Sequence, residues 1–233
     1  TNQADLEAFF VDPPSPGGGK HMHLTDAIEA WRASMPSVDL RGVSILLDCA
    51  HGAASQHAPG VLQDMGASVK LVGCSPDGRN INDGVGATHP PHSTQGCDIA
   101  ICLDGDADRL VLIDPTHGTL DGDDILWMLS RHVTGPVVGT IMTNGGLETA
   151  LQGRLLRTAV GDRHVAAAMT KTGAQIGAET SGHVLFSDGL PTGDGLYSAL
   201  RILQLGLPMK TEGWNRLPVM KTNLRFTGNK IDL

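Results

Sequence analysis

Two apolar segments of strand length, residues 99–103 and 110–113, enclose a short acidic loop. The loop alternates three carboxylates with the two smallest side chains: Asp104, Gly105, Asp106, Ala107 and Asp108. Carboxylates this close together repel one another, so in a partly desolvated position they are costly unless a cation neutralises them. Oxygen ligands suit a hard cation such as Mg2+, and a loop at the end of a strand lies where α/β proteins bind ligands. The sequence therefore predicts a magnesium site formed by Asp104, Asp106 and Asp108.

Two other interpretations of this loop are less consistent with the sequence. An EF-hand loop also begins with alternating aspartates, but it requires Gly at its sixth position and Glu at its twelfth. This chain has Arg109 and Pro115 there. A solvated acidic turn is the second alternative, and the apolar strands on both sides of the loop disfavour it.

The composition indicates a globular chain with an aliphatic core. Of its 233 residues, 40% are hydrophobic but only 3% are aromatic, and the length suits one large domain or two of ordinary size. The net charge of -8 leaves no basic face, so we expect no nucleic-acid partner. No apolar run approaches the roughly 18 to 20 residues of a membrane span, so we expect no membrane partner and a cytoplasmic protein.

The pattern of apolar segments predicts an α/β fold. A strand, a small-residue turn, a helix and a second strand are expected at 42–49, 50–54, 55–65 and 69–72. The same plan recurs later in the chain, with a strand at 137–143, a turn at 144–146, a helix from 147 onward and a second strand at 156–160. A strand-helix-strand unit makes its two strands parallel. We therefore predict two similar three-layer α/β domains with mixed, largely parallel sheets.

The second half contains a polar turn and two acidic clusters. Glu179, Ser181 and His183 lie between two short predicted strands and together offer donors and acceptors for sugar hydroxyls, although ordinary surface turns use the same residues. We expect these three residues to form one exposed turn that faces the cleft between the domains, on the same side as the acidic loop. The cluster at 121–124 and Asp194 each precede an apolar helix, so we interpret them as helix caps rather than as metal sites.

Eight motifs occur in an order that resembles the bacterial phosphoglucosamine mutase family of the α-D-phosphohexomutase superfamily. They are DCAHGA (48–53), NINDGVGAT (80–88), DGDADR (104–109), DGDDIL (121–126), MTNGGLE (142–148), VGDRHV (160–165), GAETSGH (177–183) and TGDGL (192–196). The resemblance covers roughly residues 40 to 225 and corresponds to the second and third of four domains. It implies residues 1–20 as a linker or truncated edge, 21–118 as the domain with the metal-binding loop, and 119–233 as the domain with the sugar-recognition loop.

The resemblance also implies roles for the site residues. Mg2+ would be held by the three aspartates, with Arg109 supporting the phosphate. The substrate would be a hexosamine phosphate, bound by Glu179, Ser181, His183 and Arg163. The whole enzyme would interconvert glucosamine 6-phosphate and glucosamine 1-phosphate through a phosphoserine, toward peptidoglycan precursors, and would form a homodimer.

The serine loop and the phosphate clamp that the family places in its first and fourth domains are absent from these 233 residues. By resemblance the chain is therefore a fragment, inactive alone and without a catalytic residue of its own. The chain also lacks residues that relatives carry near 89–97, 131–137 and 152–155. Two alternatives stay open at this point. One is a phosphomannomutase or phosphoglucomutase, and the other is a non-catalytic module that binds a metal ion and a sugar phosphate.

Overall fold

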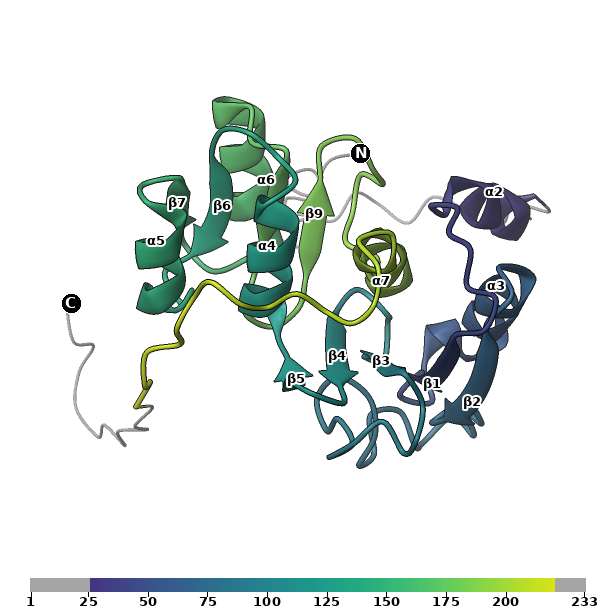
Figure 1. Ribbon diagram of the computed structural model, residues 1–233. Helices are drawn as coiled ribbons and strands as arrows, with labels where there is room; N and C mark the ends of the chain where they lie inside the picture. The colour runs from purple at the N-terminus through teal and green to yellow at the C-terminus, as the bar shows by residue number, and fades with distance from the viewer. Residues whose placement is uncertain (1–25, 221–233) are drawn as a thin grey trace, which may run out of the picture. The chain divides into compact units, whose positions relative to one another are not determined.

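The computed structural model describes residues 26–220 (Figure 1). The predicted linker at 1–20 and a strand expected at 221–227 lie outside the described residues. By its contacts the chain divides after Ser34 into two units. Of the first unit the structure describes helix α2 (Ala27–Ser34), none of whose residues is buried. All the other described elements belong to the second unit.

The first sheet has five strands in the order β2-β1-β3-β4-β5. Their bounds are β1 Ser44–Asp48, β2 Ser68–Val72, β3 Ile99–Leu103, β4 Leu110–Asp114 and β5 Gly118–Leu120. Strand β1 pairs in parallel with β2 and β3, whereas β4 is antiparallel to both β3 and β5. Every residue of β3 and β4 is buried, which explains their continuous apolar sequence. The acidic loop therefore connects two central, fully buried strands.

The second sheet has four strands in the order β7-β6-β8-β9. Their bounds are β6 Val137–Thr140, β7 Leu155–Thr158, β8 Ile176–Ala178 and β9 Val184–Phe186. Strand β6 is parallel to β7 and β8, and β9 is antiparallel to β8. The turn between β8 and β9, residues 179–183, is the one predicted to bind sugar hydroxyls and is called the sugar turn below.

Helices complete the two α/β/α domains. They are the 3-10 helix η1 (Ala53–Gln56) and the α-helices α3 (Ala58–Asp64), α4 (Gly122–Ser130), α5 (Gly145–Leu151), α6 (Asp162–Thr172) and α7 (Gly195–Leu203). Helix α3 packs on β2 and α6 packs on β6 (Figure 1). Helix α6 also packs on β8. Within the described part of the chain, no helix is long and apolar enough to cross a membrane.

The predicted fold class is confirmed, with differences in detail. Both parallel strand-helix-strand units form as expected. The expected strand 137–143 ends at Thr140, because the backbone N–H of Thr140 donates to the hydroxyl of Thr143 in a turn. Strand β4 and the short edge strand β5 form a hairpin. Helix α6 was not predicted.

Candidate functional site

The acidic loop folds around its first carboxylate. Asp104 is buried, and its Oδ1 accepts one hydrogen bond of 3.1 Å from the backbone N–H of Arg109. Ala107 has a φ of 63°, the left-handed conformation that the tight turn requires and that a small side chain tolerates best. The guanidinium Nε of Arg109 lies 3.6 Å from both Asp104 and Asp108. Arg109 thus braces two of the three carboxylates while its side chain stays 45% exposed.

The motifs at 48–53 and 80–88 pack against the acidic loop. The carbonyl of Gly105 accepts a hydrogen bond from the N–H of Ala53, and a Cβ at Gly52 would overlap the Gly105 backbone. A Cβ at Gly105 would press against the side chains of Ile81 and Asn82. Both motifs therefore pack closely around the acidic loop, the first through its backbone and the second through the side chains of Ile81 and Asn82.

The carboxylates fit a divalent cation. One ligand oxygen from each of Asp104, Asp106 and Asp108 lies within 4.8 Å of the other two. Burial raises the pKa of Asp104 to about 6, and the charges of Asp108 and Asp106 add to this rise. Among the described residues, the buried Oδ1 of Asp108 has no hydrogen-bond partner. This oxygen lies 3.6 Å from Nε of Arg109, beyond hydrogen-bond distance. A buried carboxylate oxygen without a hydrogen bond, beside two other carboxylates, is the environment that a cation relieves.

Glu179 and Ser181 lie on the wall of a pocket of about 380 Å³. Glu179 is half-buried, and its Oε1 accepts a hydrogen bond of 2.9 Å from the N–H of Gly161. Ser181 is exposed. These two residues therefore line the same pocket.

The expectation that His183 shares this exposed turn is wrong. His183 is only 5% exposed, and its Nδ1 lies 3.1 Å from Oδ2 of Asp108 in the acidic loop. The reason is backbone pairing, because the N–H of Leu110 donates to the carbonyl of Gly182 and Arg109 forms an antiparallel bridge with His183. The end of this turn is thus joined to the acidic loop and to the start of β4.

Arg163 lies apart from both groups. It is exposed in the first turn of α6, two residues after Gly161, and is not among the described residues that line the pocket. Gly161, which precedes α6, donates its backbone N–H to Oε1 of Glu179 on the pocket wall.

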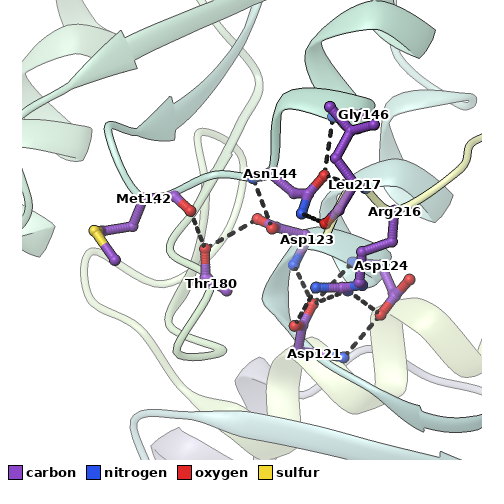
Figure 2. Close-up of polar contacts among 9 residues, drawn as sticks. All are labelled: Asp121, Asp123, Asp124, Met142, Asn144, Gly146, Thr180, Arg216 and Leu217. Carbon is purple, nitrogen blue, oxygen red and sulfur yellow. Dashed lines mark hydrogen bonds and ion pairs between the residues drawn. The ribbon is translucent and has the colours of Figure 1, made fainter. Parts of the chain in front are cut away.

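The acidic cluster at the start of α4 forms a helix cap, which confirms the sequence interpretation. Asp121 is the N-cap residue, and it forms a reciprocal capping box with Asp124. In Figure 2 the carboxylate of Asp123 lies between Asn144 and Thr180, and it accepts hydrogen bonds from the N–H of Asn144 and the hydroxyl of Thr180. Burial raises the pKa of Asp123. The first turn of α4 therefore holds the sugar turn and the β6–α5 turn together.

Arg216, which the sequence analysis did not single out, binds the same cap (Figure 2). Its guanidinium contacts both oxygens of Asp121 at 2.7 and 2.8 Å, and Oδ2 of Asp124 at 2.8 Å. Leu217 and Asn144 exchange two further hydrogen bonds. The segment 214–219 is thereby held against α4 and α5, and it supplies Arg216 and Val219 to the pocket wall.

The motif at 192–196 has a second role beyond capping. Asp194 caps α7 by accepting a hydrogen bond from the N–H of Tyr197, as predicted. In addition, a Cβ at Gly193 would overlap the imidazole of His183, and the N–H of Gly195 donates to the carbonyl of Ala107 in the acidic loop. The glycines of this motif therefore allow α7 to pack directly on the acidic loop.

Comparison with known proteins assigns the chain to a family. Residues 23–118 match the family model described as phosphoglucomutase/phosphomannomutase, alpha/beta/alpha domain II, and residues 121–212 match domain III of the same family. The chain belongs to the phosphoglucomutase/phosphomannomutase family.

Within the family, the chain is similar to bacterial phosphoglucosamine mutases. It is 40% identical over 256 residues to that of Aeromonas hydrophila, covering 99% of this chain and 58% of the relative. It is 41% identical over 251 residues to that of Xanthomonas campestris, covering 97% and 56%. The chain thus spans somewhat more than half the length of these relatives.

Solved structures share the fold at lower identity. A phosphoglucomutase/phosphomannomutase family protein from Burkholderia thailandensis has a TM-score of 0.71 and 22% identity, over 86% of this chain and 48% of that one. The Aspergillus fumigatus N-acetylphosphoglucosamine mutase in complex with GlcNAc-6P and magnesium has a TM-score of 0.62 and 22% identity, over 82% and 52%.

Proposed function

We propose that this chain provides the metal loop and the sugar turn of a phosphoglucosamine mutase, which interconverts glucosamine 6-phosphate and glucosamine 1-phosphate. The observation that carries the proposal is the direct connection between the two groups. Leu110, which follows the acidic loop, is hydrogen-bonded to Gly182 of the sugar turn. The 40% identity to enzymes of that name supports the same assignment. We further propose that the boundary between the two domains in the sequence lies between residues 118 and 121, because one family match ends at 118 and the next begins at 121.

The proposed chemistry needs charge neutralisation and alignment more than covalent assistance. Mg2+ held by Asp104, Asp106 and Asp108 would neutralise the oxygens of the transferring phosphoryl group, which a phosphoserine outside these 233 residues would carry. Arg109 would donate to the same phosphate, since its guanidinium is permanently charged and 45% exposed.

The sugar would lie in the pocket. Glu179 and Ser181 would bind its hydroxyls, and Arg163 would approach the substrate from the start of α6. The magnesium and the sugar phosphate named for the Aspergillus fumigatus structure support this choice of cofactor and substrate class. A phosphomannomutase or phosphoglucomutase activity is the alternative in which the same residues would bind a different sugar phosphate.

A chimeric enzyme tests the proposal. Residues 23–212 would replace the matching segment of the Aeromonas hydrophila enzyme, and turnover of glucosamine 6-phosphate, mannose 6-phosphate and glucose 6-phosphate would be compared. We expect turnover with a preference for glucosamine 6-phosphate, and no turnover by the 233-residue chain alone, because it has no serine loop. An inactive but folded chimera, or a preference for mannose or glucose phosphate, would contradict the assignment.

A further inference from the structure

His183 is the side chain through which the sugar turn contacts the metal loop. Its Nδ1 lies 3.1 Å from Oδ2 of Asp108, and its carbonyl accepts a hydrogen bond of 2.9 Å from the N–H of Glu179. The ring therefore contacts a carboxylate of the acidic loop, while the backbone of the same residue closes the turn that carries Glu179 and Ser181.

Among the residues that the structure describes, the ring of His183 has one polar contact, which is to Asp108. His183 is 5% exposed, and within the described part of the chain its Nε2 has no hydrogen-bond partner. The ring packs so closely on Gly193 that a Cβ there would overlap it. An imidazole confined in this way can satisfy Nδ1–H only by donating to Asp108, so the same contact restricts the orientation of the Asp108 carboxylate.

This orientation matters for cation binding. Asp108 is the one carboxylate of the three whose second oxygen is buried without a hydrogen bond among the described residues. Its other oxygen is held by His183. Groups that hydrogen-bond to a ligating carboxylate pre-orient it, and their removal typically costs about 10- to 100-fold in metal affinity.

We propose that His183 is a positioning residue that orients Asp108 for the cation and relays occupancy of the metal loop to the sugar turn. This inference rests on the proposed function, because it takes Asp104, Asp106 and Asp108 as the ligands. A bound cation fixes Asp108, Asp108 fixes the imidazole, and the hydrogen bond between His183 and Glu179 then restrains the turn. Coupling between binding sites is reciprocal, so ligands that order the turn will also strengthen cation binding.

Calorimetric titration of the 233-residue chain with Mg2+ tests the first half of the proposal. His183→Leu removes the donor, and its Kd for Mg2+ should rise about tenfold or more. His183→Asn should stay within about threefold of the wild type, because its amide nitrogen can occupy the position of Nδ1. The control is His117→Leu, a change at an exposed histidine on the β4–β5 turn, which should leave the Kd unchanged.

Gly193→Ala provides a second perturbation if the leucine variant fails to fold. It displaces the ring without changing any polar group, and it should weaken Mg2+ binding in the same direction. Equal Kd values for the wild type, the folded leucine variant and Gly193→Ala would overturn the role of His183 while leaving the metal site intact. A wild-type chain that does not bind Mg2+ would instead refute the ligands assigned under the proposed function, and this inference with them.

Hydrogen exchange tests the relay itself. Saturating Mg2+ should slow amide exchange in the peptide that spans residues 177–186 of the wild type. The leucine variant should show no such protection even when enough Mg2+ is added to saturate its weaker site. Protection that is the same in both proteins would overturn the relay.

Discussion

Replacing Glu179 by alanine should lower kcat/KM about a hundredfold in the chimeric mutase, on the order of 3 kcal/mol of transition-state binding. Glu179 is half-buried on the wall of the 380 Å³ pocket, and one of its oxygens is already held by Gly161. A carboxylate fixed in this way is pre-organised to bind a sugar hydroxyl, and misplacement of a substrate by even about 1 Å is costly to rate. Steady-state kinetics with glucosamine 6-phosphate measures the effect.

Glu179→Gln separates this role from a structural one. The amide oxygen of glutamine can still accept the hydrogen bond from Gly161, so the turn keeps its support while the negative charge is lost. We expect the glutamine variant to unfold at the same urea concentration as the wild type but to lose a large part of its activity. A fully active glutamine variant would show that Glu179 serves only to hold Gly161.

Gly182→Ala should be among the most destabilising single changes in the chain, lowering the free energy of unfolding by about 3 to 5 kcal/mol. Gly182 has a φ of 93°, and a Cβ there would overlap the carbonyl oxygen of Leu110. The N–H of Leu110 donates to the carbonyl of Gly182, so the clash falls on the backbone contact between the acidic loop's strand and the sugar turn.

Gly153→Ala is the matched control. Gly153 has a similar φ of 85°, but a Cβ there would meet nothing within 4 Å. Gly153→Ala should therefore lower the free energy of unfolding by only roughly 1 to 2 kcal/mol, the cost of placing an alanine in the left-handed conformation. Urea unfolding of both variants measures the difference, and equal losses would mean that the contact between Gly182 and Leu110 contributes little to stability.

The two strands beside the acidic loop were the easiest to predict from the sequence. Strands β3 and β4 are buried along their whole length, so their apolar sequences were unambiguous and the acidic residues between them stood out. Helix α6 was missed because it buries only Val165 and Met169 and offers little apolar periodicity. The sequence does contain two indications of this helix. Three successive alanines favour helix formation, and Gly173 is a residue that commonly ends a helix in the left-handed conformation, as it does here.

The features of the site that could not be predicted from the sequence depend on contacts between residues far apart in the chain. The pairing of Arg216 with Asp121 joins positions 95 residues apart, and the contact of His183 with Asp108 spans 75. Neither contact has a local signature. His183 was expected to be exposed because the residues around it are polar, but the bridge to Arg109 draws it under Gly193. Burial of a turn residue depends on the partner segment, which only the fold supplies.

The central claim is that Asp104, Asp106 and Asp108 together bind one divalent cation. Crystals of the chain soaked in Mn2+, whose anomalous scattering locates the ion, test this most directly. We predict a single strong peak with an oxygen from each of the three aspartates within about 2.0 to 2.6 Å. A peak that contacts only one of these carboxylates, or a fully occupied Mn2+ site elsewhere with this loop empty, would contradict the account.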